Sequence, residues 1–425
     1  MITIAICGCG NRGLTAYTQY QFDHPDRMKV TAGADIRPER LGLLRKMYDV
    51  PADMCFHSDE ELLAQPKLAD AMLISTPDRL HVKEALAALE KGYDLLLEKP
   101  ISPDPAECLA LYRKAAGNGR KVVVCHVLRY TPFYSAIGRL VHEGALGQVL
   151  TIDMTENVGY WHYCHSFVRG NWRNSQLSSP MILQKCCHDM DLLNWLAGGR
   201  CLSVQSFGRQ SFFNSGHAPE GCSDRCLTCR YSDTCLYSAK VQYILDPVRG
   251  VKAAGNSWPV NVVADEPMEE SVLTALRDGP YGRCVFACDN DVVDHQTLSL
   301  QFENDLFATF TMSAFSEKID RTIKITGTKG ELYGALSANA VTLQRFGQPA
   351  EQIDLAVLGG HEGHGGGDLG LAADFTDLLE KGGGSRTSIE ASMESHMIAF
   401  AAEESRKRDG ELIRMEEFMK KYQYC

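Results

Sequence analysis

The sequence lacks long apolar runs and has fewer basic than acidic residues. No stretch approaches the roughly 20 consecutive apolar residues that a transmembrane helix requires, so we expect no membrane span. The formal net charge is −11, and nucleic-acid binding requires a basic face, so we expect no nucleic-acid partner. Met1 to Cys7 lead directly into a glycine motif and leave no room for a signal peptide, which predicts a cytoplasmic protein.

Internal repeats and low-complexity segments are also missing. The 16 prolines and 37 glycines are spread along the chain, which excludes fibrous and disordered classes. A length of 425 residues is long for one hydrophobic core and sufficient for two. The 16 cysteines should be mostly reduced thiols in a cytoplasmic protein, apart from those in a metal site.

Apolar strand patterns alternate with helical patterns over the first part of the chain. Strands are predicted at 2–7, 28–34 and 69–74, each followed by a helical segment, and two more follow before Cys125. This alternation predicts right-handed βαβ units and a parallel sheet. We therefore expect an α/β Rossmann domain over residues 1–125.

The pattern changes over residues 126–425. Residues 298–315 alternate apolar and polar side chains around Asn304-Asp305, which is typical of a β-hairpin, and residues 321–334 predict a second one. Together with the helical segments, these hairpins predict an α+β domain with a mainly antiparallel open sheet. Such a sheet favours face-to-face association, so we expect a homodimer or homotetramer.

A glycine motif directly follows the first predicted strand. Gly8, Gly10 and Gly13 fit G-x-G-x-x-G, and Asp35 lies 22 positions after Gly13 at the end of the second strand. This context is typical of dinucleotide binding, with the pyrophosphate at a helix N-terminus and Asp35 on the ribose hydroxyls. A carboxylate there favours NAD over NADP, although Arg37 softens the preference. The residues expected to line the cofactor here are Gly8, Gly10, Asn11, Arg12, Gly13, Asp35, Ile36 and Arg37.

Three further motifs give a resemblance that extends over nearly the whole chain. They are Ser75-Thr76-Pro77 with His81, then Glu98-Lys99-Pro100, then a His-x-x-Asp segment that begins at His188. With the glycines, they make the chain resemble the Gfo/Idh/MocA family of sugar and cyclitol oxidoreductases. The resemblance implies that the first two motifs lie against the dinucleotide, which adds to the cofactor site Ser75, Thr76, Pro77, His81, Glu98 and Lys99.

The resemblance also implies that Lys99 and His188 are the catalytic pair. Oxidation of an alcohol needs a base for the hydroxyl proton, and histidine titrates in the right range. A lysine ammonium beside the oxygen would stabilise the developing alkoxide. The alternatives are a solvated lysine at a strand end and a histidine that merely begins a helix.

One position departs from the family. Many members have an aspartate four residues before this histidine, whereas this chain has Gln184 followed by Lys185. Glutamine cannot take a proton, which puts an Asp–His relay in doubt. Lys185 either supplies a second catalytic cation or forms a salt bridge at the domain surface.

Several polar and aromatic residues are placed to line a substrate cleft. His126 and Arg129 follow the last Rossmann strand, and His165, Arg169 and Trp172 lie on a His-rich aromatic segment. Stacking on a sugar face would suit such a segment, although a packed loop explains it nearly as well. The expected substrate-binding residues are His126, Arg129, His165, Arg169, Trp172, Gln184 and His188.

Four cysteines gather in an insertion near residues 217–240. Cys222, Cys226, Cys229 and Cys235 have the clustered spacing of a tetrahedral structural zinc site. His217 is an alternative fourth ligand. An iron–sulfur cluster and four unbound thiols remain alternatives, since spacing alone does not separate them.

A glycine-rich run, 361–368, carries two histidines and ends at Asp368. Its composition suggests a metal site, but a flexible loop in which Asp368 caps the following helix is the commoner structure. From such a loop, His364 could reach the substrate cleft.

These residues together predict an NAD-dependent oxidoreductase. Hydride would pass between the nicotinamide and a carbon that carries a secondary hydroxyl on a sugar, glycoside or cyclitol. One alternative is a glycosidase in which NAD oxidises the sugar transiently, the aglycone is eliminated and the hydride returns. A second alternative is a non-catalytic dinucleotide-binding sensor, although such a protein has no need for both Lys99 and His188.

Overall fold

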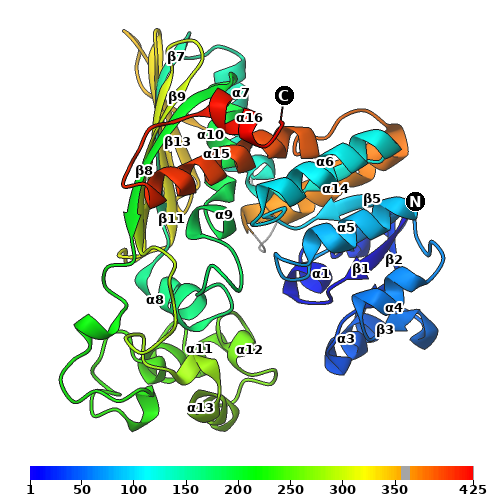
Figure 1. Ribbon diagram of the computed structural model, residues 1–425, viewed down its shortest axis with the longest axis vertical. Helices are drawn as coiled ribbons and strands as arrows, with labels where there is room; N and C mark the ends of the chain where they lie inside the picture. The colour runs from blue at the N-terminus through cyan, green and yellow to red at the C-terminus, as the bar shows by residue number, and fades with distance from the viewer. Residues whose placement is uncertain (356–363, 425) are drawn as a thin grey trace.

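The structure is a computed structural model that describes residues 1–355 and 364–424. Figure 1 shows the N-terminal domain, in blue and cyan, beside a second domain whose large sheet is seen edge-on. A segment drawn in green extends from the end of that sheet and carries α11, α12 and α13. The predicted fold class, a Rossmann domain followed by an α+β domain with a mainly antiparallel sheet, is confirmed.

The first domain is built on a six-stranded parallel sheet with the order β3-β2-β1-β4-β5-β6. Its strands are buried on both faces, which explains why they appear as continuous apolar runs in the sequence. The strands are β1 (Ile2–Cys7), β2 (Met28–Ala34), β3 (Cys55–Phe56), β4 (Ala71–Ile74), β5 (Asp94–Leu97) and β6 (Val122–Val124). The helices are α1 (Asn11–Thr15), α2 (Tyr20–Asp23), α3 (Pro38–Tyr48), α4 (Asp59–Ala64), α5 (His81–Glu90) and α6 (Pro105–Asn118).

The helix expected after the first strand is interrupted. The sequence pattern predicts one helix over 14–22, whereas the chain forms α1 and α2 with a turn between them. The Thr18 hydroxyl donates to the Gly13 carbonyl at 2.7 Å, and the Tyr48 hydroxyl donates to the Leu14 carbonyl. Because side chains take the carbonyls that would continue the helix, the helix stops.

The second domain contains a nine-stranded sheet with the order β14-β13-β12-β11-β7-β10-β9-β8-β15. Among the described strands of this second sheet, only β7 and β10 pair in parallel. The strands are β7 (Val149–Asn157), β8 (Cys201–Arg209), β9 (His295–Phe302), β10 (Phe307–Ser313), β11 (Asp320–Gly327), β12 (Gly330–Ala335), β13 (Ala340–Arg345), β14 (Glu351–Ile353) and β15 (Ile413–Arg414). Both predicted hairpins are present, and Asn304 and Asp305 have the positive φ angles of 61° and 59° that the first turn requires.

The helices of the second half lie mostly between the large sheet and the Rossmann domain or near the insertion, whereas one of them packs into the Rossmann domain (Figure 1). They are α7 (Pro132–His142), α8 (Tyr160–Tyr163), α9 (Met181–Gln184), α10 (Cys187–Ala197), α11 (Val251–Ala254), α12 (Val260–Val263), α13 (Glu269–Asp278), α14 (Gly367–Lys381), α15 (Ile389–Lys407) and α16 (Met415–Lys421). None of the helices in the described part of the chain is long and apolar enough to cross a membrane.

Helix α14 belongs to the second half of the chain but packs into the core of the first domain. Leu371 and Phe375 are fully buried there against the residues of β1 and β2. The position of the boundary at residues 125/126 remains a prediction. Because α14 packs into the first domain, the side chains at its start lie beside the glycine motif.

The insertion between β8 and β9 has a small core of its own. Tyr243, Val260 and Leu276 are buried in it together with Cys226. Arg40 at the start of α3 lies 3.9 Å from Asp265 of the insertion. The insertion therefore reaches across to the nucleotide-binding side of the first domain.

Candidate active site

The glycine motif forms a tight turn with open space in front of it. Gly8 has φ +90°, and a Cβ atom there would lie 2.8 Å from the Ser75 backbone. A Cβ atom at Gly13 would lie 2.2 Å from the Gly8 carbonyl oxygen. At Gly10, by contrast, a Cβ atom would meet nothing within 4 Å among the described residues. These residues therefore fit a dinucleotide, whose pyrophosphate would lie against Gly10 and Asn11 at the start of α1.

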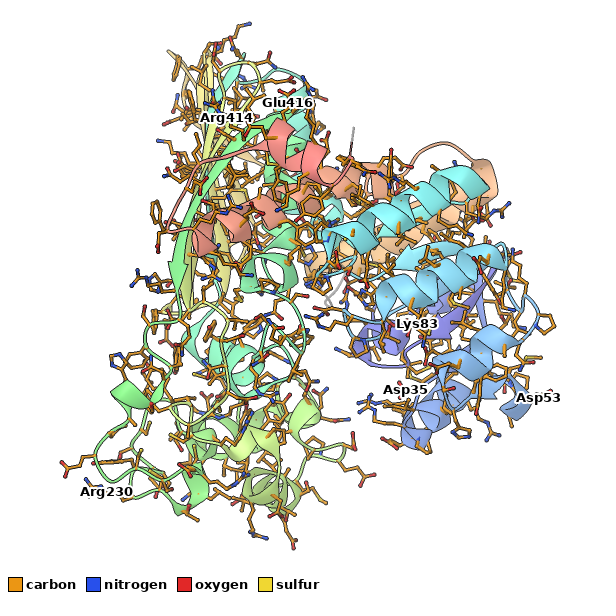
Figure 2. The ribbon with its side chains drawn as sticks, viewed as in Figure 1. Asp35, Asp53, Lys83, Arg230, Arg414 and Glu416 are labelled. Atoms are coloured by element: carbon orange, nitrogen blue, oxygen red, sulfur yellow. The ribbon has the colours of Figure 1, made fainter. Side chains whose placement is uncertain are left out.

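Asp35 follows β2 at the place where a ribose would lie. Its Oδ1 accepts a hydrogen bond of 2.9 Å from the Arg37 backbone N–H, which fixes the carboxylate. Ile36 beside it is 79% exposed. Figure 2 shows Asp35 on the side of the Rossmann domain that faces the insertion. The arrangement suits a carboxylate that accepts hydrogen bonds from ribose hydroxyls.

The loop that follows β4 is tied both to the glycine turn and to the next loop. The Ser75 hydroxyl donates to the Gly8 carbonyl at 2.8 Å. The two ring nitrogens of His81 lie 2.8 Å from the Thr76 carbonyl and 2.8 Å from the Pro100 carbonyl. His81 thus holds the Ser75-Thr76-Pro77 turn against the Glu98-Lys99-Pro100 segment, and we assign it a positioning role.

Glu98 and Lys99 extend from the end of β5 in different directions. Glu98 is buried and accepts hydrogen bonds from Arg12 Nε at 2.7 Å and from the Tyr17 hydroxyl at 2.5 Å. Burial alone would raise the pKa of Glu98, but Arg12 and Lys99 outweigh it and the pKa is lowered. The Lys99 Nζ donates to the Gln184 carbonyl at 2.7 Å, and it has no carboxylate partner among the described residues. The Lys99 side chain therefore lies at the junction of the two domains, held by a carbonyl and unpaired with any carboxylate of the described residues.

Histidines from four elements converge beside Lys99. The ring centroid of His188 lies 5.8 Å from that of His126 and 5.8 Å from that of His364, and the His126 ring lies 5.6 Å from that of His396. In the described part of the chain, neither ring nitrogen of His126 or His188 has a hydrogen-bond partner. Burial, followed by the charge of Lys99, holds the pKa of His188 well below its usual range. Burial lowers the pKa of His126 in the same way, so both sites disfavour the charged imidazolium and leave the ring nitrogens without a hydrogen-bond partner in the described residues.

Buried ion pairs fix helix α10, which carries His188. Arg129 donates to both oxygens of Asp191 at 2.7 and 2.6 Å. Arg321 pairs with Asp189 at 2.8 Å and with Glu156 at 2.8 Å, and Lys185 Nζ lies 3.2 Å from Glu156. The two aspartates of the His188-Asp189-Met190-Asp191 segment thus anchor the helix. Arg129 and Lys185 are both engaged in ion pairs, and the partner of Lys185 is the buried Glu156 rather than a group at the domain surface; a catalytic role for Lys185 stays a prediction.

Gln184 and Trp172 contact each other in the loop before α10. The Gln184 side-chain amide donates to the Trp172 carbonyl at 2.8 Å, and its oxygen accepts from Ser178 at 3.1 Å. Trp172 remains 45% exposed. Gln184 therefore acts on Lys99 through its backbone carbonyl, while Trp172 is the member of the aromatic segment with surface to offer a substrate.

His165 and Arg169 contact the insertion. His165 Nδ1 lies 2.7 Å from the Tyr243 hydroxyl, and its ring stacks on Tyr281. Arg169 is fully buried and donates to the carbonyls of Arg283 at 2.7 Å and Tyr237 at 2.6 Å. For these two residues the structure favours the packed-loop interpretation over substrate binding.

The expected zinc site is not supported. Cys222, Cys226, Cys229 and Cys235 line one small cavity of about 20 Å³ together with Cys284, and all are free thiols. Within residues 1–355 and 364–424, no group of three or more His, Cys, Asp or Glu residues is arranged to hold a metal ion. The Cys226 sulfur instead contacts Arg169 Nη2 and the Arg283 carbonyl, each at 3.6 Å, so packing contacts occupy it.

Residues 364–368 of the glycine-rich run do not have the predicted role. Residues 361–363 lie outside the part of the chain that the structure describes. Helix α14 begins at Gly367 with Gly366 before it and no side-chain cap, so the prediction that Asp368 caps the helix is wrong. Asp368 instead accepts two hydrogen bonds from Arg12, at 3.0 and 2.8 Å, and lies 3.2 Å from His364 Nδ1. No local pattern could reveal these contacts, because Arg12 and Asp368 are 356 residues apart.

Comparison with family models places most of the chain in one family. Residues 2–126 match the model described as an oxidoreductase family with an NAD-binding Rossmann fold. Residues 134–333 match the GFO/IDH/MocA C-terminal domain. The two matches adjoin each other at the junction where Lys99 and the histidines meet.

Known proteins agree with this placement. The chain is 23% identical to the Bacillus subtilis protein YteT over 88% of each chain. It is 27% identical to inositol 2-dehydrogenase of Corynebacterium glutamicum over 48% of this chain and 56% of that protein, so it spans about half the length of that relative. A levoglucosan dehydrogenase solved with NADH and levoglucosan superposes with a TM-score of 0.71 at 16% identity, covering 97% of this chain and 99% of that one. The chain is therefore an NAD-binding oxidoreductase of the Gfo/Idh/MocA family.

Proposed function

We propose that the protein is an NAD-dependent dehydrogenase that acts on a secondary hydroxyl of a sugar, glycoside or cyclitol. The observation that carries the proposal is that, within the described residues, Lys99 has no carboxylate partner and the buried imidazoles of His126 and His188 beside it have no hydrogen-bond partner. Inositol 2-dehydrogenase and levoglucosan dehydrogenase are names of relatives and neighbours with the same architecture. Both names denote oxidation of polyhydroxylated rings, which supports this substrate class.

Each residue near the junction would have a distinct task. When bound, the nicotinamide supplies the hydride acceptor. Lys99 would donate a hydrogen bond to the reacting hydroxyl and stabilise its oxygen as negative charge develops. His188 and His126 would hold the hydroxyl through the ring nitrogens that have no protein partner in the described residues. Because the surrounding Arg and Lys side chains are paired with carboxylates, Lys99 is the cation that this site directs at the substrate.

Asp35 supports a preference for NAD over NADP. The carboxylate is fixed by the Arg37 N–H and would repel a 2′-phosphate on the ribose. Arg37 Nε lies 3.7 Å from the same carboxylate, so its charge is already partly committed to Asp35. We therefore assign NAD as the physiological cofactor and NADP as the weaker one.

The proposal is tested with a panel of polyols that includes myo-inositol, levoglucosan and p-nitrophenyl glycosides. Reduction of NAD is followed by absorbance in single turnovers with wild type, Lys99→Met and a matched control, Lys83→Met. Lys83 lies on the surface of α5, where its side chain is 61% exposed (Figure 2). We expect Lys99→Met to lower the rate by roughly 10²- to 10⁴-fold with NAD affinity unchanged, and the control to match wild type.

Two outcomes would contradict the dehydrogenase assignment. Tight NAD binding with no NADH from any member of the panel would leave the chain as a dinucleotide sensor. Release of p-nitrophenol with only transient NADH would identify the redox-neutral glycosidase, in which the hydride returns to the sugar.

A further inference from the structure

We propose that His364, held by Asp368, is the group that exchanges the proton of the reacting hydroxyl. The inference rests on the proposed function, because it assigns a residue to that hydride transfer. It differs from the expectation that the resemblance gives, in which the His188 imidazole does this work. The carboxylate-backed imidazole comes from the turn just before α14 rather than from α10.

The contacts of His364 specify which of its nitrogens is free. Its Nδ1 lies 3.2 and 3.5 Å from the two oxygens of Asp368. Arg12 Nη1, which can only donate, lies 3.5 Å from the same nitrogen. The nearer Asp368 oxygen is closer, at 3.2 Å, and can only accept, so the geometry favours a proton on Nδ1 that is donated to Asp368. The lone pair then resides on Nε2, for which the described residues offer no hydrogen-bond partner. The pair has the Asp–His arrangement that orients a general base.

Asp368 is held in its charged form by the glycine motif. Arg12 donates to both of its oxygens at 3.0 and 2.8 Å and also donates to Glu98 at 2.7 Å. The charge of Arg12 and the contact with His364 outweigh the burial of Asp368 and lower its pKa. One arginine thus links the cofactor turn, the Lys99 segment and the imidazole. Helix α14 packs on the same domain, so the three groups share one rigid frame.

His188 lacks these features. In the described residues neither of its ring nitrogens has a hydrogen-bond partner, so no carboxylate selects its tautomer. It is only 4% exposed, whereas the His364 side chain is 37% exposed. A base must return its proton to water after each turnover. The exposed His364 side chain can release the proton directly to solvent, whereas the buried His188 side chain cannot. With Gln184 in place of the family aspartate, Asp368 and His364 form the closer of two carboxylate–imidazole pairs among the described residues of this junction, at 3.2 Å against 4.0 Å between Asp191 and His126.

The step balances with the groups named. The O–H bond of the substrate breaks and its proton moves to His364 Nε2. The hydride leaves the same carbon for the nicotinamide, and the carbon–oxygen bond becomes a carbonyl. The substrate is oxidised by two electrons, NAD is reduced, and His364 releases one proton to solvent. Lys99 would stabilise the oxygen throughout, and His188, whose ring centroid lies 5.8 Å from that of His364, would help to position it.

The first test is chemical rescue in single turnovers with NAD and whichever polyol of the panel wild type oxidises. We expect His364→Ala to lose roughly 10²- to 10⁴-fold in rate, the usual worth of a positioned base. Added imidazole should restore at least tenfold, because the His364 side chain is 37% exposed and its place can be reached from solvent. Asp368→Asn should slow the reaction, whereas Asp377→Asn, on the exposed part of the same helix, should not. Wild-type rates in His364→Ala, or failure of imidazole to rescue it, would overturn the proposal.

The second test does not depend on turnover. Nitrogen-15 spectra of histidine-labelled protein, assigned by loss of a signal in His364→Gln, report the tautomer directly. The proposal requires protonated Nδ1 and bare Nε2 in wild type, and loss of that preference in Asp368→Asn. A protonated Nε2 would overturn it. If wild type oxidises no polyol, the proposed function fails, and the tautomer still decides whether the Asp368–His364 pair exists.

Discussion

The buried pair of Arg129 and Asp191 provides a quantitative test of how the helix that carries His188 is held. Asp191 is 1% exposed and Arg129 is 5% exposed, and two hydrogen bonds of 2.7 and 2.6 Å join them. Removal of one partner from such a pair leaves an uncompensated buried charge, which costs about 3–5 kcal/mol. We therefore expect Arg129→Met and Asp191→Leu each to lower the free energy of unfolding by that amount.

The double variant is more informative than either single one. Once both charges are gone, no buried ion is left without a partner, so the loss should be clearly smaller than the sum of the single losses. We expect a coupling free energy of at least ~2 kcal/mol in the double-mutant cycle. Urea denaturation followed by circular dichroism measures all four proteins.

The exposed pair of Arg200 and Glu303 is the matched control. It also has close contacts, at 2.8 Å, but the Arg200 side chain is 77% exposed. Solvent screens such a pair, so Glu303→Gln should leave the urea midpoint unchanged. If Arg129→Met and Asp191→Leu prove additive within about 0.5 kcal/mol, the two side chains are not coupled and the anchoring argument is refuted.

Three further expectations concern the cofactor site and the histidines. Asp35→Ser should narrow or reverse the preference for NAD over NADP, and equal binding of both nucleotides by wild type in titrations would contradict the role of Asp35. Gly8→Ala should abolish NAD binding while the chain still folds, since the new Cβ would stand 2.8 Å from the Ser75 backbone in a residue with φ +90°; unchanged affinity by calorimetry would show that the turn tolerates a side chain. Burial lowers the pKa values of His126 and His188, so unfolding takes up protons below about pH 6.5. Stability should therefore fall as the pH drops below that value, and His188→Gln should reduce the slope in urea titrations; an identical slope would mean that His188 is not buried neutral.

Much of the fold could be predicted because its signals are local. The parallel strands are continuous apolar runs, and Gly8, Gly10 and Gly13 occupy a turn whose backbone demands them. The Asn304-Asp305 turn predicted its hairpin because both residues tolerate positive φ. The interruption between α1 and α2 could not be predicted, since it depends on the Tyr48 hydroxyl from another helix.

The contacts that a side chain makes could not be predicted from its residue type alone. The sequence identifies His165 and Arg169 as polar residues in an aromatic segment, which suits a sugar site as well as a packed loop. Only the fold shows that carbonyls of the insertion take the Arg169 donors. The zinc prediction is not supported for a related reason, because spacing brings the cysteines to one cavity but does not say whether three or more of them are arranged to hold a metal ion.

The sequence by itself determined the dinucleotide motif, the Lys99 segment and the His188 helix, because each is set by neighbouring residues and backbone requirements. The tertiary structure determined which groups lie next to each charged side chain. Arg12 and Asp368 meet across 356 residues of chain, and helix α14 brings His364 to the ring of His188. Electrostatics and hydrogen bonding act over a few ångströms in space and are indifferent to separation along the chain. For that reason the identity of the proton-exchanging histidine emerges only from the folded molecule.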